Sequence, residues 1–200
     1  MPGTLLFARH GQTEWNLQRR RQGQLDSPLT AAGVAHARSV ADTARRGGVD
    51  VIYSSPLGRA RVTAASAAAA TGAHVTFLDD LTEVNHGDFA GFTDAQIGDR
   101  FADHWGRRAG ELYTWRFPNG ESYEDADQRA ARALRQVTAG AGRVALIVSH
   151  EMIGRMLLGQ ALGLSPDEAL GLSLLHGAVY RLVAGQPLIA WEPPTGGQPA

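Results

Sequence analysis

The chain has no cysteine, no lysine and no long hydrophobic run. Without cysteine, disulfides and thiolate metal sites are excluded, and a reducing cytoplasm is the natural expectation. Because no apolar stretch could span a bilayer and residues 1–6 do not resemble a signal peptide, we expect no membrane association. All 19 basic residues are arginine, and with 20 acidic residues they give a formal net charge of -1. This balance offers no support for a nucleic-acid partner.

The composition is that of one globular core. Two hundred residues with 44% hydrophobic content can fill a single core, and no linker divides the chain, so we expect one domain over 1–200. The poorly patterned region at about 93–120 is interpreted as an insertion or lid. The Pro- and Gly-rich tail, 193–200, is expected to be frayed.

Short apolar segments alternate with helical patterns along the chain. Thr30 and Ser122 have the character of helix N-caps, and Ser55 followed by Pro56 predicts a third helix start. This order predicts an α/β fold, a three-layer sandwich with a mainly parallel central sheet and helices on both faces. Its edge strand would permit a homodimer. The strands are expected at 5–8, 51–53, 74–78, 144–148, 178–183 and 187–191, and the main helices at about 30–47, 56–71, 122–139 and 152–162.

Four chemically distinctive residues follow the carboxyl ends of predicted strands: His10, Arg59, Glu83 and His150. In a parallel sheet these ends share one edge, where ligands bind. Arg59 falls in the first turn of a helix, where the helix dipole disfavours a cation, so a bound anion would explain its placement. One histidine alone is more often structural than catalytic, but the joint placement favours a shared site.

These residues lie within motifs that resemble the histidine phosphatase superfamily, most closely its phosphoglycerate mutase-like phosphatases. The resemblance extends from Leu5 to about Leu182. The motifs are Arg9-His10-Gly11 with Thr13, Trp15 and Asn16; Ser55-Pro56 with Arg59, Thr63 and Ala64; Glu83 with Gly87 and Gly91; and Ser149-His150 with Arg155.

The resemblance implies a phosphatase that acts on a small phosphorylated substrate and needs no metal or cofactor. His10 would attack phosphorus and become a transient phosphohistidine. Arg9, Arg59 and His150 would neutralise the phosphoryl oxygens, with a hydrogen bond from Asn16. In this scheme the proton donor to the leaving group is Glu83.

Further residues are placed near the substrate by the same resemblance. Gln22 and Gly23 would contact phosphate or substrate from their loop, and Thr13 would be a hydrogen-bonding neighbour. Glu151 is expected to point away from the phosphate, because its carboxylate would repel it, or to bind a polar substrate group. A segment over the pocket would include Glu121 and Ser122. We expect His86 to be a polar loop residue without a role in the site. Arg19 and Arg20 are expected to form a solvated surface.

Two alternatives stay open beside the phosphatase. A phosphoglycerate mutase of this superfamily would usually be longer, and the compact length together with Gln22-Gly23 and the stretch 25–29 favours hydrolysis. A phospho-ligand-binding module without turnover would usually have lost a catalytic group, whereas all are present here. The motifs do not identify the substrate, whose choice we expect the region from Thr93 to Phe117 to determine.

Overall fold

The computed structural model describes residues 2–183, 186 and 189–190. A six-stranded sheet lies at its centre, in the order β3-β2-β4-β1-β5-β6. The first four strands in this order are parallel, β5 is antiparallel to β1, and β6 is antiparallel to β5. The predicted mainly parallel sheet is confirmed. The strands are β1 (Thr4–Arg9), β2 (Val51–Ser54), β3 (His74–Phe77), β4 (Val144–Ser149), β5 (Val179–Val183) and β6 (Ile189–Ala190).

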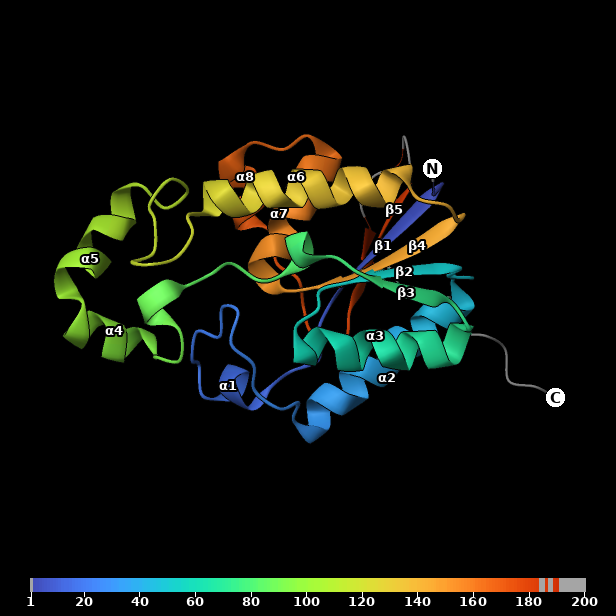
Figure 1. Ribbon diagram of the computed structural model, residues 1–200, viewed down its shortest axis with the longest axis horizontal. Helices are drawn as coiled ribbons and strands as arrows, with labels where there is room; N and C mark the ends of the chain where they lie inside the picture. Colours follow the sequence, from blue (N-terminus) through green and yellow to red (C-terminus); the bar gives the residue numbers. More distant parts are fainter. Residues whose placement is uncertain (1, 184–185, 187–188, 191–200) are drawn as a thin grey trace.

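Helices cover both faces of this sheet, as Figure 1 shows. Side chains alternate along β1, so that Leu5 and Phe7 join one hydrophobic cluster while Leu6 and Ala8 join the other. The predicted three-layer arrangement follows from this two-sided burial. One face carries α2 (Ala31–Arg46) and α3 (Gly58–Thr71); the other carries α6 (Tyr123–Ala139), α7 (Glu151–Leu162) and α8 (Pro166–Gly171).

The helix starts show where local sequence signals succeed and where they fail. Thr30 caps α2, and Ser122 with Asp125 forms a capping box at α6, both as predicted. The predicted start of α3 at Pro56 is wrong by two residues, because Ser55 does not cap it. Asp26, from a distant loop, accepts hydrogen bonds from the amides of Gly58 (2.6 Å) and Arg59 (3.3 Å) instead.

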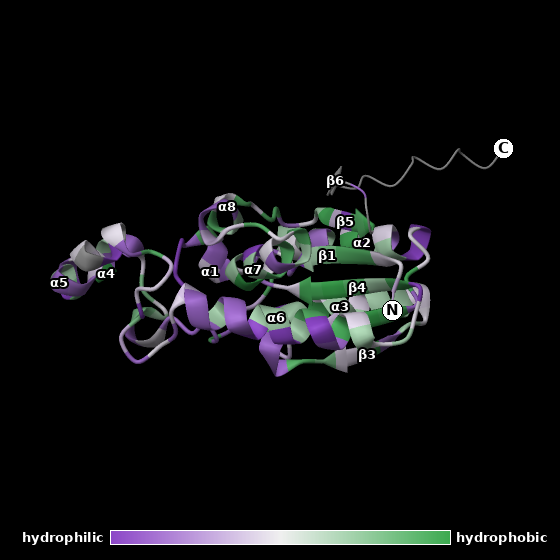
Figure 2. Ribbon diagram, turned by 90° about the horizontal axis from the view of Figure 1, so that it is seen from above, coloured by the Kyte–Doolittle hydropathy of each residue, from purple (hydrophilic) through white to green (hydrophobic). Residues whose placement is uncertain are grey.

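The region predicted as an insertion contains α4 (Asp94–Arg100), α5 (Ala102–Arg107) and the 3-10 turn η3 (Arg108–Gly110). It stands at one end of the molecule, apart from the hydrophobic strands (Figures 1 and 2). Its aromatic side chains Trp105, Tyr113 and Trp115 pack against the core. The predicted frayed tail, 193–200, lies outside the described residues, as does all of the predicted strand at 187–191 except 189–190.

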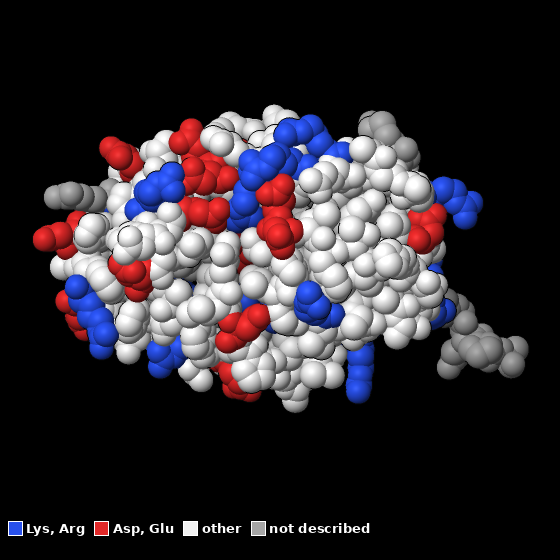
Figure 3. All heavy atoms as spheres, viewed as in Figure 1, with Lys and Arg blue, Asp and Glu red and all other residues white. Residues whose placement is uncertain are grey.

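Charges of both signs lie side by side on the surface. On the face shown in Figure 3, arginines and carboxylates gather together over α6. Within the described part of the chain, no helix is long and apolar enough to cross a membrane.

Candidate active site

The candidate site lies where β1 and β4 end next to each other. Arg9 is in register with Ser149, and the amide of His10 donates to the carbonyl of Ser149 at 2.9 Å. The chain leaves β1 toward α2 on one face and leaves β4 into α7 on the other. Such a divergence opens a crevice beyond the strand ends. The rings of His10 and His150 meet there, with 5.1 Å between their centroids.

His10 is held as a neutral base. Its Nδ1 lies 2.7 Å from the carbonyl oxygen of Gly11. Because a carbonyl only accepts, Nδ1 carries the hydrogen and Nε2 keeps its lone pair. The Nε of Arg59 donates to this Nε2 at 3.2 Å. Burial, with the nearby charges of Arg59 and Arg9, holds the pKa of His10 well below its ordinary value. The ring is therefore neutral, and its Nε2 lone pair points to an arginine.

His176 supports the backbone of His10. Its Nδ1 donates to the carbonyl of His10 at 2.8 Å, and the two rings make an edge contact with centroids 5.5 Å apart. His36 of α2 stacks on the other side of His176 at 5.8 Å. Burial first, then the charge of Arg9, lowers the pKa of His176 to about 4. A neutral imidazole thus links α2 to the end of β1.

Arg59 projects from the first turn of α3, as predicted, and is almost fully bonded. Its Nη1 donates to the carbonyl of Leu25 (2.7 Å) and to Asp26 (2.8 Å), and its Nη2 to the carbonyl of Gly23 (2.7 Å). Gly23 has φ +55, a left-handed conformation that favours glycine. The loop that follows Asn16 therefore fixes the guanidinium beside His10.

Glu83 lies beyond β3, after the 3-10 turn η1 (Asp79–Leu81), and binds the start of α7. Its carboxylate accepts from the amides of Val84 (2.9 Å), Ile153 (3.1 Å) and Met152 (3.3 Å). The amides of Met152 and Ile153 lie in the first turn of α7, the positive end of that helix, where a carboxylate is favoured. The side chain is buried and reaches the same cavity as His10.

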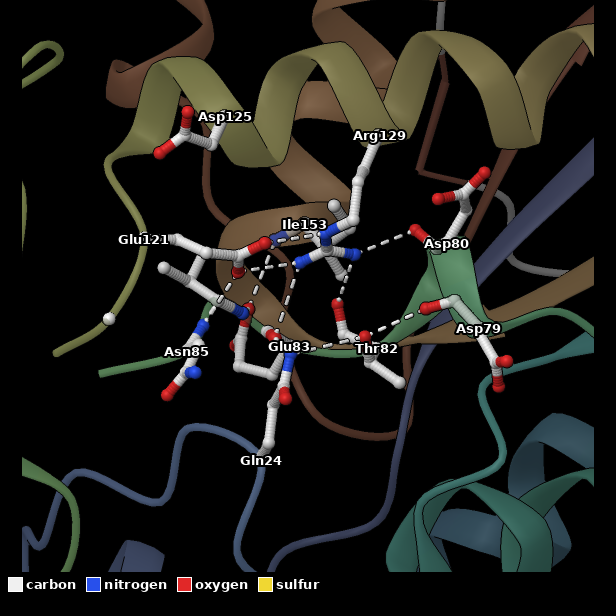
Figure 4. A network of polar contacts seen from close by, with 12 residues as sticks. Gln24, Asp79, Asp80, Thr82, Glu83, Asn85, Glu121, Asp125, Arg129 and Ile153 are labelled. Atoms are coloured by element: carbon white, nitrogen blue, oxygen red, sulfur yellow. Dashed lines mark hydrogen bonds and ion pairs between the residues drawn. The ribbon is translucent and has the colours of Figure 1, made fainter. Parts of the chain in front are cut away.

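Arg129 of α6 clamps the loop that carries Glu83 (Figure 4). It donates to the carbonyls of Asp80 (2.9 Å) and Thr82 (3.0 Å), and pairs with Glu121 at 2.8 Å. Glu121 also accepts from the amide of Asn85 at 2.8 Å. The predicted segment over the pocket therefore contributes an ion pair that holds the loop, and Glu121 does not line the cavity.

Glu151 lies on the cavity wall between two arginines. It forms ion pairs with Arg9 and, at 2.7 Å, with Arg155. The expectation that it points away is wrong, because these two guanidinium groups hold its carboxylate in place. Arg9 also donates to the carbonyl of Leu174 at 3.2 Å, and burial lowers the pKa of Arg9.

These residues enclose a cavity of about 150 Å³. Eight predicted site residues line it: Arg9, His10, Asn16, Gln22, Gly23, Arg59, Glu83 and Glu151. We call Arg9, His10, Arg59 and Glu83 its strand side, and Arg20, Arg21 and His86 its loop side. A larger hollow of about 430 Å³, around Leu5 and Leu182, has no ionisable residue among the described residues of its lining. Among the described residues, no group of three or more His, Cys, Asp or Glu is arranged to hold a metal ion.

Two predicted site residues lie behind the wall instead. His150 is fully buried, its Nε2 lies 2.8 Å from the hydroxyl of Ser55, and burial holds its pKa well below the ordinary value. Thr13 caps the short helix α1 (Glu14–Leu17) and accepts a hydrogen bond from Gln22 at 2.8 Å. Thr13 thus positions Gln22 of the wall, whereas His150 packs against the ring of His10.

The loop side was missed by the sequence interpretation. His86 is only 6% exposed, and neither ring nitrogen has a partner among the described residues. Burial and then Arg21 lower its pKa to about 3. Arg20 donates to the carbonyl of Gly91 at 2.7 Å, and Arg21 pairs with Asp94 at 2.7 Å. Their sequence signal was proximity alone: Arg20 and Arg21 follow Asn16 closely, and His86 stands three residues after Glu83.

An oxyanion would satisfy polar groups of this site that have no hydrogen-bond partner in the described structure. The Nε of Arg9 and the Nδ1 of His150 are buried without a partner in the described structure. Buried polar atoms are costly to leave unpaired, and charged donors bind anionic oxygens most strongly. A neutral histidine, two arginines and a glutamate around one cavity form a set that can transfer a phosphoryl group.

Comparisons with known proteins agree with this chemistry. The family model of the histidine phosphatase superfamily (branch 1) matches residues 5–187. A Shigella boydii protein named "Probable phosphoglycerate mutase GpmB" is 36% identical over 178 residues, which cover 88% of this chain and 82% of that protein. A solved mycobacterial glucosyl-3-phosphoglycerate phosphatase is 30% identical with a TM-score of 0.77, covering 89% of this chain and 90% of that one. The alpha-ribazole phosphatase of Shigella flexneri, 22% identical, shares the fold with a TM-score of 0.83 over 89% of each chain.

Proposed function

This chain belongs to the histidine phosphatase superfamily, and we propose that it hydrolyses a phosphate monoester through a phosphohistidine on His10. The observation that carries the proposal is the state of that ring. Its Nδ1 hydrogen is bonded to Gly11, so the Nε2 lone pair is directed into a cavity that also contains Arg59 and Glu83. A lone pair so placed can attack phosphorus once the Nε of Arg59 transfers its hydrogen bond from Nε2 to a phosphoryl oxygen.

In the first step, Nε2 of His10 forms a bond to phosphorus while the bond to the ester oxygen breaks. Arg9 and Arg59 stabilise the charge on the phosphoryl oxygens, which is the task that a metal ion performs in other phosphoryl-transfer sites. Glu83 gives its proton to the departing alkoxide. A phosphoryl dianion beside His150 would favour the protonated form of that ring, which is neutral in the free protein.

In the second step, water attacks the phosphohistidine. Glu83, now a carboxylate, takes a proton from that water as the new oxygen–phosphorus bond forms. The phosphorus–nitrogen bond breaks, and its electron pair returns to Nε2. Inorganic phosphate leaves, and Glu83 has regained the proton that it gave to the alkoxide.

The test compares the wild type with His10→Ala on p-nitrophenyl phosphate. We expect the variant to lose about 10⁴-fold in kcat, because the covalent route is removed. Brief incubation of the wild type with a ³²P-labelled ester should leave an acid-labile, base-stable label on the protein, and His10→Ala should take up none. Equal hydrolysis by both proteins would contradict the proposal and would leave a phospho-ligand-binding module as the better interpretation.

Phosphoglycerate mutase is the second candidate function, favoured by the name of the 36% identical relative. A mutase and a phosphatase share the first step and differ in what takes the phosphoryl group. Incubation with 3-phosphoglycerate and a trace of 2,3-bisphosphoglycerate, followed by ³¹P NMR, separates them. Formation of 2-phosphoglycerate with little free phosphate would establish the mutase.

A further inference from the structure

We infer that Glu151 selects the alcohol of the substrate: it accepts a hydrogen bond from an uncharged hydroxyl and rejects an alcohol with a second negative charge. This inference rests on the proposed function. Among the described residues that line the cavity, two carry a carboxylate: Glu83 and Glu151. A cavity built for phosphate places the negative charge of Glu151 on its own wall, which calls for an explanation.

The hydrogen bonds of Glu151 leave one oxygen open. Its Oε1 accepts from Nε (3.0 Å) and Nη2 (2.7 Å) of Arg155 and from the amide of Leu174 (3.4 Å). Its Oε2 accepts from Arg9 alone among the described residues. A carboxylate oxygen can accept two hydrogen bonds. The side chain is 17% exposed, so Oε2 can take one further donor from the cavity.

An ionised carboxylate can only accept. A substrate hydroxyl would satisfy Oε2, whereas a substrate carboxylate would meet it as a like charge at short range. Arg9 cannot offset that repulsion fully, because it already shares its charge between Glu151 and the incoming phosphoryl group.

The other arginines of the wall are also committed. Arg59 pairs with Asp26 and Arg21 pairs with Asp94, each at 2.8 Å or less. Arg20 has no carboxylate partner within the described residues, but two of its nitrogens donate to Gln18 and Gly91. The positive charge of the wall is therefore largely taken up before a second anionic group arrives.

His86 adds the same preference from the loop side. Its pKa of about 3 keeps the ring neutral, so that one ring nitrogen is a donor and the other an acceptor. Neither nitrogen has a hydrogen-bond partner among the described residues. A polyhydroxy alcohol can use both, whereas a carboxylate can use the donor only. Together these observations give the substrate class as phosphate monoesters of uncharged, hydroxyl-bearing alcohols.

The test uses two esters that differ at one carbon. Glycerol 3-phosphate carries a hydroxymethyl group where 3-phosphoglycerate carries a carboxylate. We expect the wild type to prefer glycerol 3-phosphate by at least roughly tenfold in kcat/KM, and Glu151→Gln, of equal size, to reduce that preference to about threefold or less. The control is Asp42→Asn, which removes an exposed carboxylate of α2 paired with Arg45 and should keep the wild-type ratio.

Each outcome decides the matter. Preference of the wild type for 3-phosphoglycerate, or equal ratios in the wild type and Glu151→Gln, would overturn the inference even if p-nitrophenyl phosphate is hydrolysed. Failure to hydrolyse any of the three esters would instead contradict the proposed function. Calorimetric binding of the two glycerol-skeleton esters to His10→Ala would then still decide whether Glu151 discriminates between them.

Discussion

The strand side and the loop side of the cavity differ in how their polar groups are held. On the strand side, the Nδ1 of His10 and every nitrogen of Arg59 have partners in the free protein. On the loop side, both nitrogens of His86 have none among the described residues. Apart from the Nε of Arg9, the groups of the strand side are held in place before substrate binds, and Arg59 exchanges its bond to His10 for one to the substrate. The loop side leaves hydrogen-bonding capacity for a ligand, so it is the side on which specificity can vary.

After the loss of His10 itself, the largest effect should come from the strand side, through Glu83→Gln. We expect kcat/KM for an alkyl phosphate to fall about 10³-fold, because the amide cannot supply a proton to the alkoxide and kcat/KM does not include the later hydrolysis of the phosphohistidine. With p-nitrophenyl phosphate the loss should be only about tenfold, because that phenolate leaves without protonation. Steady-state assays on both esters measure this, with the exposed Glu124→Gln of α6 as control. Equal losses on both esters would show that Glu83 is no proton donor.

The clamp behind Glu83 should give the next largest effect. Arg129→Ala leaves Glu121 partly buried without its partner and removes donors from two loop carbonyls, which should lower the free energy of unfolding by about 3 kcal/mol. Arg132→Ala, on the same helix, breaks an exposed pair with Asp80 and should cost less than about 1 kcal/mol. Urea unfolding of the two variants makes the comparison.

Equal destabilisation by the two substitutions would contradict the clamp. If the clamp is correct, Arg129→Ala should also reproduce in part the leaving-group dependence of Glu83→Gln, because a loosened loop misplaces the acid. Arg132→Ala should not.

The strand side was largely predictable from the sequence because each of its residues follows a recognisable local pattern. The apolar run that becomes β1 ends at Arg9 and His10, and Arg59 stands in the first turn of a helix that follows a strand. Strand periodicity and the parallel order are enough to bring such tips together. The predicted layers and the mainly parallel sheet are correct for the same reason.

What the sequence could not show were contacts between residues far apart in the chain. The cap of α3 comes from Asp26, 32 residues before Gly58, and replaces the local signal of Ser55. Glu151 faces the cavity because it meets Arg9, 142 residues away. The position of His150 behind the wall depends likewise on a tertiary contact, with Ser55. Local sequence patterns predict helices, strands and the residues at their ends. Which side chains pair with one another depends on the tertiary structure.

A test of the loop side is the dependence of stability on pH. His86 has a pKa of about 3 when folded, against an ordinary 6.5, so between these values the unfolded chain binds more protons. The contribution of neutral His86 to the free energy of unfolding is thus fully present above pH 6.5. It is lost as pH falls, by about 2 kcal/mol between pH 6.5 and 5. His86→Phe should remove this pH-dependent contribution, so that the free energy of unfolding changes less between the two pH values. Urea unfolding at both pH values, with exposed His74→Phe as control, measures it; an unchanged slope would show that His86 is not held neutral.

His10, His150 and His176 act in the same direction, since their pKa values are also lowered by burial. The wild type should therefore lose more stability toward acid than His86 alone accounts for. This acid sensitivity is the consequence of keeping several neutral imidazoles around a cavity with four arginines in its lining.

The smallest expected effect concerns the support of the nucleophile by His176. His176→Leu removes the donor to the carbonyl of His10, and a slightly misplaced Nε2 should lower kcat about tenfold with KM nearly unchanged. His176→Asn can donate from its amide near the position of Nδ1, so it should stay within about threefold of the wild type. Thermal melts of both variants separate this effect from loss of folding. Equal losses in kcat, or a change confined to KM, would show that the bond from His176 does not position His10, and the strand side would then owe its geometry to β1 and Arg59 alone.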